Sequence, residues 1–110
     1  MIEVIVVDYL NDNLEVPVFM EMPEVQPERF VLVERTGGSE EEHIRYAALA
    51  IQSYAESRYQ AAALNEMVKK AMKNIVILDS IFKSKLNSDY NFTDTTKKKH
   101  RYQAVYDLVY

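Results

Sequence analysis

Few side chains in this sequence could catalyse a reaction or hold a metal ion. The only two histidines, His43 and His100, are 57 residues apart, and there is no cysteine. His43 directly follows three carboxylates, Glu40, Glu41 and Glu42, and imidazole and carboxylate groups can both ligate a metal. Carboxylates in consecutive positions cannot all face one ion, however, and zinc sites draw on several histidine or cysteine ligands. A solvated acidic loop is therefore the simpler interpretation.

The sequence also lacks the residue patterns of a serine hydrolase site and of a phosphate-binding loop. A serine hydrolase needs a serine, a histidine and an acid in contact, and Ser39 has only two histidines in the chain to meet. The only two glycines, Gly37 and Gly38, are adjacent and are not followed by Lys-Ser or Lys-Thr, so no phosphate loop is present. We expect no catalytic residues, no cofactor and no metal.

A basic segment near the C-terminus is the strongest chemical signal. It comprises Lys97, Lys98, Lys99, His100 and Arg101, with Tyr90, Phe92 and Tyr102 close by. Basic charge binds nucleic acid whatever its sequence, and aromatic rings can stack on bases. The alternative is a solvated hairpin tip whose aromatic residues belong to the flanking strands. The net charge of −4 favours this second interpretation, because nucleic-acid binders are usually basic.

The elements that position these residues are organised around the apolar run Phe30–Val33. This run is rich in β-branched residues and fits a strand buried on both faces. We expect Gly37 and Gly38 to end the strand in a turn with positive φ, since glycine adopts that conformation without steric cost. The other elements then form a sheet around this strand, with two helices covering it.

Two segments are compatible with either a helix or a strand. In Ile2–Leu14 the run Val4–Val7 favours a strand, whereas apolar residues at helical spacing favour an amphipathic helix that closes near Asn13. We prefer the helix. In Ile44–Ala55 small and apolar residues alternate as in a strand, but a helix over Glu40–Asn74 competes because alanine is the best helix former.

The clearest helix begins after Ser57. Ser57 and Gln60 have the spacing of a capping box, in which the serine side chain accepts from a backbone N–H of the first turn. An apolar stripe follows, formed by Ala61, Leu64, Met67, Val68, Ala71 and Met72. We expect Leu64 and Met67 to pack on the sheet. Lysines 69, 70 and 73 lie near the C-terminus, where the helix dipole favours cations.

Three further segments are expected to form strands. Pro17–Met22 carries proline at its first position, where no ladder donor is lost. Ile77–Lys85 and Tyr102–Tyr110 alternate with the period of a strand. The polar segment Asn87–Lys99 would connect them as a long hairpin. No linker or repeat divides the 110 residues, so we expect one α+β domain.

Composition excludes several broad classes. Hydrophobic residues make up 48% and charged residues 27% of the chain, as in ordinary globular proteins. The longest apolar runs are far too short to span a membrane, and the start Met-Ile-Glu-Val lacks the basic region of a signal peptide. The absence of cysteine suits a reducing compartment.

Charge is divided unevenly along the chain. Residues 1–57 contain 3 Lys/Arg and 12 Asp/Glu, whereas residues 58–110 contain 10 and 5. Solvated faces would explain this, and so would a dipolar subunit that docks head to tail on its own copies. The acidic interface candidates are Glu40, Glu41 and Glu42. The basic candidates are Lys69, Lys70 and Lys73, or Lys97, Lys98 and Lys99.

Several segments, taken in order, resemble the small tail-terminator, or tail-to-head joining, proteins of long-tailed phages and prophages. They are Asp8-Tyr9-Leu10-Asn11 with Val16-Pro17-Val18, the pattern Phe-Val-x-Val-Glu-Arg-Thr-Gly-Gly within Pro27–Gly38, Ala48–Ala55, and Arg101–Leu108. The resemblance covers nearly the whole chain. One departure is Ser84–Lys99, where similar proteins carry a proline-containing loop and this chain has no proline.

The resemblance implies a mostly antiparallel sheet of four to five strands packed by two helices, with Ile2–Leu14 as helix and Ile44–Ala55 as strand. It implies a hexameric ring that caps the tail tube and joins it to the head, without catalysis. The partners would be copies of the chain itself, the tail-tube protein and a head-completion or neck protein. DNA would pass only as cargo through the lumen. The protein would be located in the virion tail, assembled in the host bacterial cytoplasm.

Overall fold

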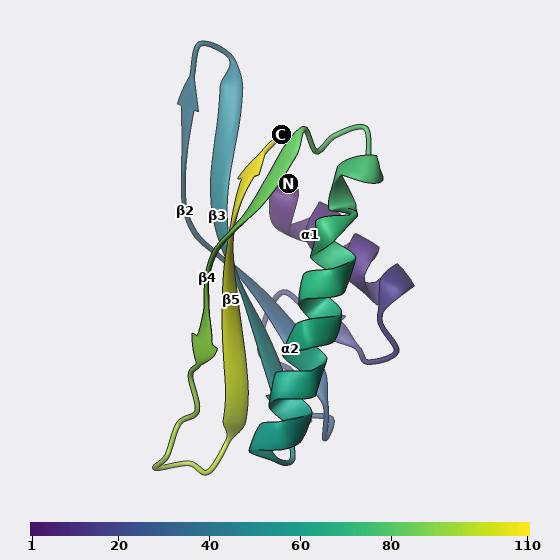
Figure 1. Cartoon of the computed structure of the whole chain (residues 1–110), viewed down its shortest axis with the longest axis vertical. Coiled ribbons are helices and arrows are strands. Elements are labelled where there is room, and N and C mark those ends of the chain that lie inside the picture. Colours follow the sequence, from purple (N-terminus) through teal and green to yellow (C-terminus); the bar gives the residue numbers. More distant parts are fainter.

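The computed structural model describes all 110 residues and shows an α+β fold, with both helices on one face of a five-stranded sheet (Figure 1). The elements are α1 (Ile2–Asn13), β1 (Val18–Phe19), β2 (Phe30–Glu41), β3 (Ile44–Ala55), α2 (Arg58–Lys73), the 3-10 turn η1 (Ile75–Ile77), β4 (Lys83–Asn91) and β5 (His100–Val109). The expected fold class is confirmed.

The strand order is β1-β2-β3-β5-β4. Strands β2, β3, β5 and β4 pair antiparallel with their neighbours, and only the short β1 pairs parallel, with β2. The middle strand is therefore β3, and the expectation that the sheet is built around Phe30–Val33 is wrong. Strand β3 takes the middle position because most of its residues from Ala47 onward are apolar or small on both faces and can be buried on both sides.

The main core lies between the helices and the sheet. It contains Ile2, Val6 and Leu10 of α1, Leu64, Val68 and Met72 of α2, and Val31, Val33, Leu49, Ile51, Ala104 and Leu108 of the sheet. The helix over 2–13 and the strand over 44–55 are thus both confirmed. The expected left-handed cap of α1 is absent, because Leu14 after the helix is extended, with φ of −120°.

A second, smaller cluster lies on the sheet face that carries no helix. Phe30 and Tyr54 stack with ring centroids 4.7 Å apart, and Leu32 and Phe19 complete the group. Residues 30–33 are all buried, as expected of a strand covered on both faces. The two clusters explain why this run is apolar at every position rather than at alternate ones.

Helix α2 begins as predicted, but the burial of two of its side chains differs from the prediction. The backbone N–H of Gln60 donates to Oγ of Ser57 at 3.1 Å, which confirms the cap. Leu64 packs in the core, but Met67 is 52% exposed, so its predicted packing on the sheet is wrong. Asn65, which was not expected in the core, is only 2% exposed. The helix is rotated so that Asn65 rather than Met67 faces β4.

The glycine turn is also a correction. Strand β2 continues through Gly37 and Gly38 to Glu41, and neither glycine has positive φ. The chain reverses instead at Glu42 and His43, whose φ angles are 50° and 71°. Gly38 is needed for close approach: a Cβ there would lie 2.7 Å from the Tyr46 carbonyl oxygen and 2.3 Å from Nη2 of Arg35.

Other strand boundaries shift as well. Most of the expected strand over 77–85 is not a strand: Ile77 ends a 3-10 turn, and a loop follows up to Lys83. Ile77 and Ile81 were expected on one face, but Ile77 is 78% exposed and Ile81 is buried. Strand β4 starts only at Lys83 and continues to Asn91, so it includes the first part of the expected hairpin 87–99. In the expected strand 17–22 only Val18 and Phe19 pair.

Candidate interaction surfaces

The β2–β3 hairpin projects beyond the rest of the sheet as an arm, defined here as residues 34–46 (Figure 1). Every residue of the arm is exposed. The pairing stays regular from Gly37 opposite Ala48 to Glu41 opposite Ile44, so the arm is ordered up to its tip. On its outer side β1 covers only Val31 and Leu32, which leaves the edge of β2 open along the arm.

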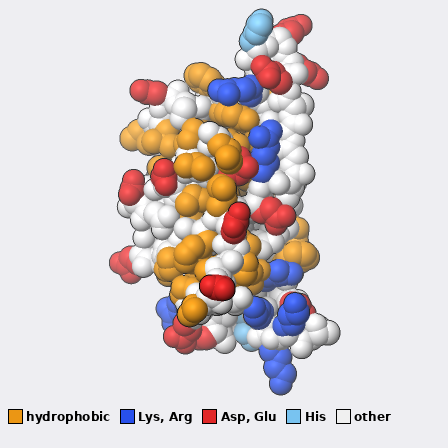
Figure 2. Space-filling view, turned by 180° about the vertical axis from the view of Figure 1, so that it is seen from behind, with side chains coloured by type: hydrophobic (Ala, Val, Ile, Leu, Met, Phe, Trp, Pro, Cys, Tyr) orange, Lys and Arg blue, Asp and Glu red, His pale blue; other side chains and the backbone are white.

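The arm tip is acidic. Glu40 and Glu41 end β2, Glu42 lies in the reversing turn, and none of the three forms an ion pair. The acidic tip lies at one end of the molecule, and the connection between β4 and β5, which contains Lys97, Lys98 and Lys99 and which we call the basic hairpin, lies at the other end (Figure 1). Figure 2 shows acidic side chains gathered at the first end and basic side chains at the second. The predicted loop at 40–42 is therefore exposed as expected, but its first two residues belong to a strand.

A second surface lies between α2 and the edge strand β4. It is a groove of about 620 Å³, which we call the lysine groove. Its cationic side chains are Lys69, Lys70 and Lys73 of α2 and Lys85 of β4. Met72, Leu86 and Tyr106 contribute an apolar lining. The three predicted lysines thus lie together, and the structure adds Lys85, which helical spacing could not have indicated.

One of these lysines is neutralised within the chain. Nζ of Lys69 lies 2.5 Å from Oδ2 of Asp89 and 2.8 Å from Oε1 of Glu66. The hydrogen bond to Asp89, and then that to Glu66, raise the pKa of Lys69 well above its usual range. Asn65 donates from Nδ2 to the other oxygen of Asp89 at 2.6 Å. The cluster joins α2 to β4 and leaves the remaining three lysines without a carboxylate partner.

The sequence did not predict this cluster, although the position of Asn65 on the helix could have indicated a buried polar contact. Asn65 lies four residues after Ala61 and three before Val68, both buried, and so falls on the apolar stripe of α2. A polar residue on such a stripe requires a partner when buried. The identity of that partner, Asp89, depends on the register of β4 against β5, which the sequence did not indicate.

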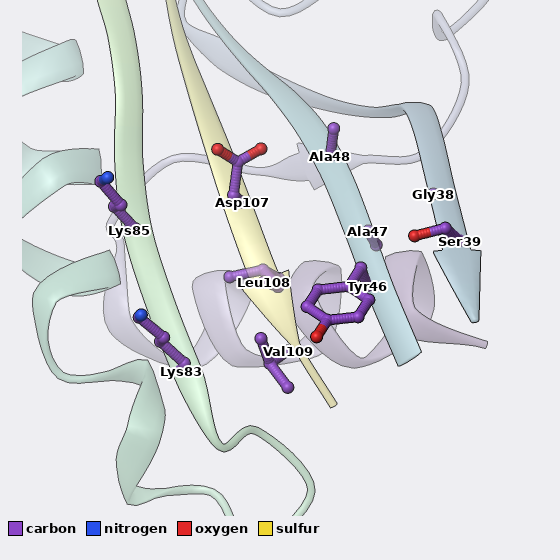
Figure 3. Close-up of a pocket in the computed structure, with 10 residues that line it drawn as sticks. All are labelled: Gly38, Ser39, Tyr46, Ala47, Ala48, Lys83, Lys85, Asp107, Leu108 and Val109. Carbon is purple, nitrogen blue, oxygen red and sulfur yellow. The ribbon is translucent and has the colours of Figure 1, made fainter. Parts of the chain in front are cut away.

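A hollow of about 520 Å³ lies on the helix-free face, where the arm joins the sheet. Figure 3 shows Lys83 and Lys85 on one side, Tyr46 and Val109 below, and the small residues Gly38, Ala47 and Ala48 opposite. Asp107, between them, accepts a hydrogen bond from Nδ2 of Asn87 at 2.9 Å. The lining combines small and apolar residues with the charged Lys83, Lys85 and Asp107, and it contains no serine–histidine pair.

The basic hairpin is largely engaged within the chain. The Arg101 guanidinium lies 4.3 Å from the centre of the Phe92 ring, and its Nη1 donates to the Tyr54 hydroxyl at 2.9 Å. Lys99 donates to Oε1 of Gln26 at 2.7 Å. Basic and aromatic residues do meet here, but among the lysines and Arg101 only Lys97 and Lys98 have side chains without partners.

The histidines lie at opposite ends of β3. His43 is at the arm tip, whereas His100 pairs with Ala55 at the other end of that strand. Ser39 is in the arm, remote from His100. No three His, Asp or Glu side chains are placed to hold a metal ion together.

The chain matches no protein-family model and no curated protein sequence. Neither helix has the length and apolar character needed to cross a bilayer.

Proposed function

We propose that this chain is a structural protein of a phage tail, a tail terminator whose copies form a ring. The ring would cap the tail tube and join it to the head, without catalysis. Two considerations support the proposal: the order of segments resembles that of tail-terminator proteins, and the surfaces of the fold suit assembly in a ring.

The observation that carries the proposal is the presence of two unlike charged surfaces on different strands of one sheet. The arm extends from β2 and β3, and the lysine groove lies along the far edge strand β4, with β5 between β3 and β4. A contact between unlike patches is heterologous, so every copy that docks leaves a free patch for the next copy. Repeated docking of this kind closes into a ring when the rotation per copy allows it.

The arm itself is better suited to an assembly than to a monomer. An isolated two-stranded ribbon is only marginally stable in water, and this arm is exposed on both faces. The outer edge of β2 also presents unpaired backbone groups, which soluble monomers usually cover or blunt with charge. Packing against a neighbouring copy would cover both features.

In the proposed assembly the two rims of the ring contact different proteins. One rim would meet the tail-tube protein and the other a head-completion or neck protein, with DNA passing through the lumen as cargo. Binding of nucleic acid by residues 97–101 is the alternative function. It is less favoured because Arg101 and Lys99 are engaged within the chain, which leaves two free lysines.

The test is the mass of the purified protein by size-exclusion chromatography with light scattering, followed by electron microscopy. We expect a hexamer of the 12.8 kDa chain with a central opening, forming alone or on the tail-tube protein. Added to polymerising tail-tube protein, it should stop tube growth. The proposal would be overturned if the protein stayed monomeric at every concentration, formed no ring and did not bind the tail tube. A monomer or dimer that shifts labelled DNA at physiological salt would favour the alternative.

A further inference from the structure

We infer that the acidic arm tip of one copy docks in the lysine groove of the next copy. The inference rests on the proposed self-assembly and names the two surfaces that meet. It commits to a second copy of this chain as the occupant of the groove.

The unpaired charges on the two surfaces are opposite in sign. Glu40, Glu41 and Glu42 carry three carboxylates without ion-pair partners. In the groove Lys69 is already held by Asp89 and Glu66, so Lys70 and Lys73 carry ammonium groups without partners. Lys85 adds a third from the edge strand β4, where it also borders the hollow on the helix-free face. Opposite charges of this kind steer encounter and disfavour contact between like surfaces.

Apolar side chains accompany the charges on both surfaces. Ile44 and Tyr46 of the arm are 44% and 38% exposed, and Leu86 at the groove is 40% exposed. Exposed ion pairs are individually weak and are screened by salt, so burial of these side chains would supply much of the affinity.

The arm cannot occupy the groove of its own chain. Its two strands are held together by a regular ladder, and β3 continues directly into the body of the sheet. The arm projects beyond the rest of the sheet (Figure 1), away from the groove between α2 and β4, so its tip cannot fold back into that groove. The occupant must therefore come from another molecule.

The basic hairpin is a less suitable partner for the tip. It lies at the opposite end of the long axis from the arm tip (Figure 2), so contact between the two would join copies end to end. Contact between the tip and the groove at the far edge of the sheet places copies side by side, as a ring requires. The hairpin also offers only Lys97 and Lys98 as free cations.

Charge reversal tests the inference directly. One variant carries Glu40→Lys, Glu41→Lys and Glu42→Lys, and a second carries Lys70→Glu, Lys73→Glu and Lys85→Glu. All six side chains are exposed, so both variants should fold, with melting temperatures close to wild type. Each alone should assemble at least about tenfold more weakly than wild type, because the tip and the groove then carry the same sign. An equimolar mixture should recover assembly, since the tip of each variant complements the groove of the other. A chain with all six reversals should also recover it.

The matched control is Lys97→Glu with Lys98→Glu, which reverses exposed charges of the hairpin and should leave assembly unchanged. If wild type forms the ring but both reversals assemble normally, or the mixture is not rescued, the docking inference is wrong and the proposed function stands. If the groove reversals abolish binding of the tail-tube protein while the ring forms normally, the occupant is that protein, and the inference is again wrong. If wild type never self-assembles, the proposed function fails first.

Discussion

Gly38 occupies a position in the arm where a side chain has no room. Its missing Cβ would meet the Tyr46 backbone carbonyl at 2.7 Å, and that carbonyl is fixed by the β2–β3 ladder. Arg35, whose Nη2 would lie 2.3 Å away, is flexible and can move, but the carbonyl cannot. The neighbouring Gly37 has nothing within 4 Å of its Cβ position. The two glycines, adjacent in sequence, therefore differ in what they tolerate.

We expect Gly38→Ala to destabilise the arm by about 1–3 kcal/mol, because the added methyl group forces the two strands apart. Gly37→Ala should be neutral or slightly stabilising, since its space is open and alanine restricts the unfolded chain. Amide hydrogen exchange across residues 34–46, together with thermal unfolding, would measure the difference. Equal effects at the two positions would contradict the close approach at Gly38.

At the scale of the element, helix α2 packs through a stripe whose phase the structure defines. Leu64 is 9% exposed and contacts the main core, whereas Met67, three residues later, is 52% exposed. Both side chains are large and apolar, so hydrophobicity alone does not distinguish them.

Leu64→Ala should therefore cost about 2–5 kcal/mol of unfolding free energy through lost burial and the cavity left behind. Met67→Ala should change the unfolding free energy by less than about 1 kcal/mol, because about half of the side chain is exposed to solvent in the folded protein. Urea denaturation of the two variants provides the comparison. A larger loss for Met67→Ala would mean that the helix is rotated from the orientation described.

At the scale of the whole molecule, the fold separates the charges that the sequence divides between its halves. The acidic arm comes from the first half, and the lysine groove comes from the second. Within the groove, the Lys69 cluster joins α2 to β4. Two buried tyrosines, Tyr9 and Tyr106, lie on the same side of the sheet, in the main core.

Stability is expected to decrease in alkaline solution. The pKa of Lys69 is raised by its hydrogen bonds to Asp89 and Glu66, and burial raises the pKa of Tyr9 and Tyr106. Raised folded-state values stabilise the protein below the unfolded pKa values, roughly 10 to 10.4, and this contribution is lost as pH rises through the folded values. The melting temperature should therefore fall above about pH 10. Lys69→Gln should show a shallower fall, and a fall identical to wild type would exclude the lysine as a contributor.

The sequence by itself determined the features that depend on neighbouring residues. The cap at Ser57, the extent of α2 and the alternation of β5 follow from spacing within a few positions, and all are confirmed. The buried strand at Phe30–Val33 was equally clear, since an unbroken apolar run requires cover on both faces.

Tertiary structure decided the features that depend on what lies opposite. Residues 2–13 are rich in β-branched side chains and are helical because their apolar face packs on the sheet and α2, which outweighs weak local preference. Gly38 is a site of close approach rather than a turn because the Tyr46 carbonyl lies against it. Asn65 is buried and Met67 is exposed because Asp89 faces one side of α2. In each case the burial of a side chain depends on a partner distant in sequence, which local periodicity does not specify.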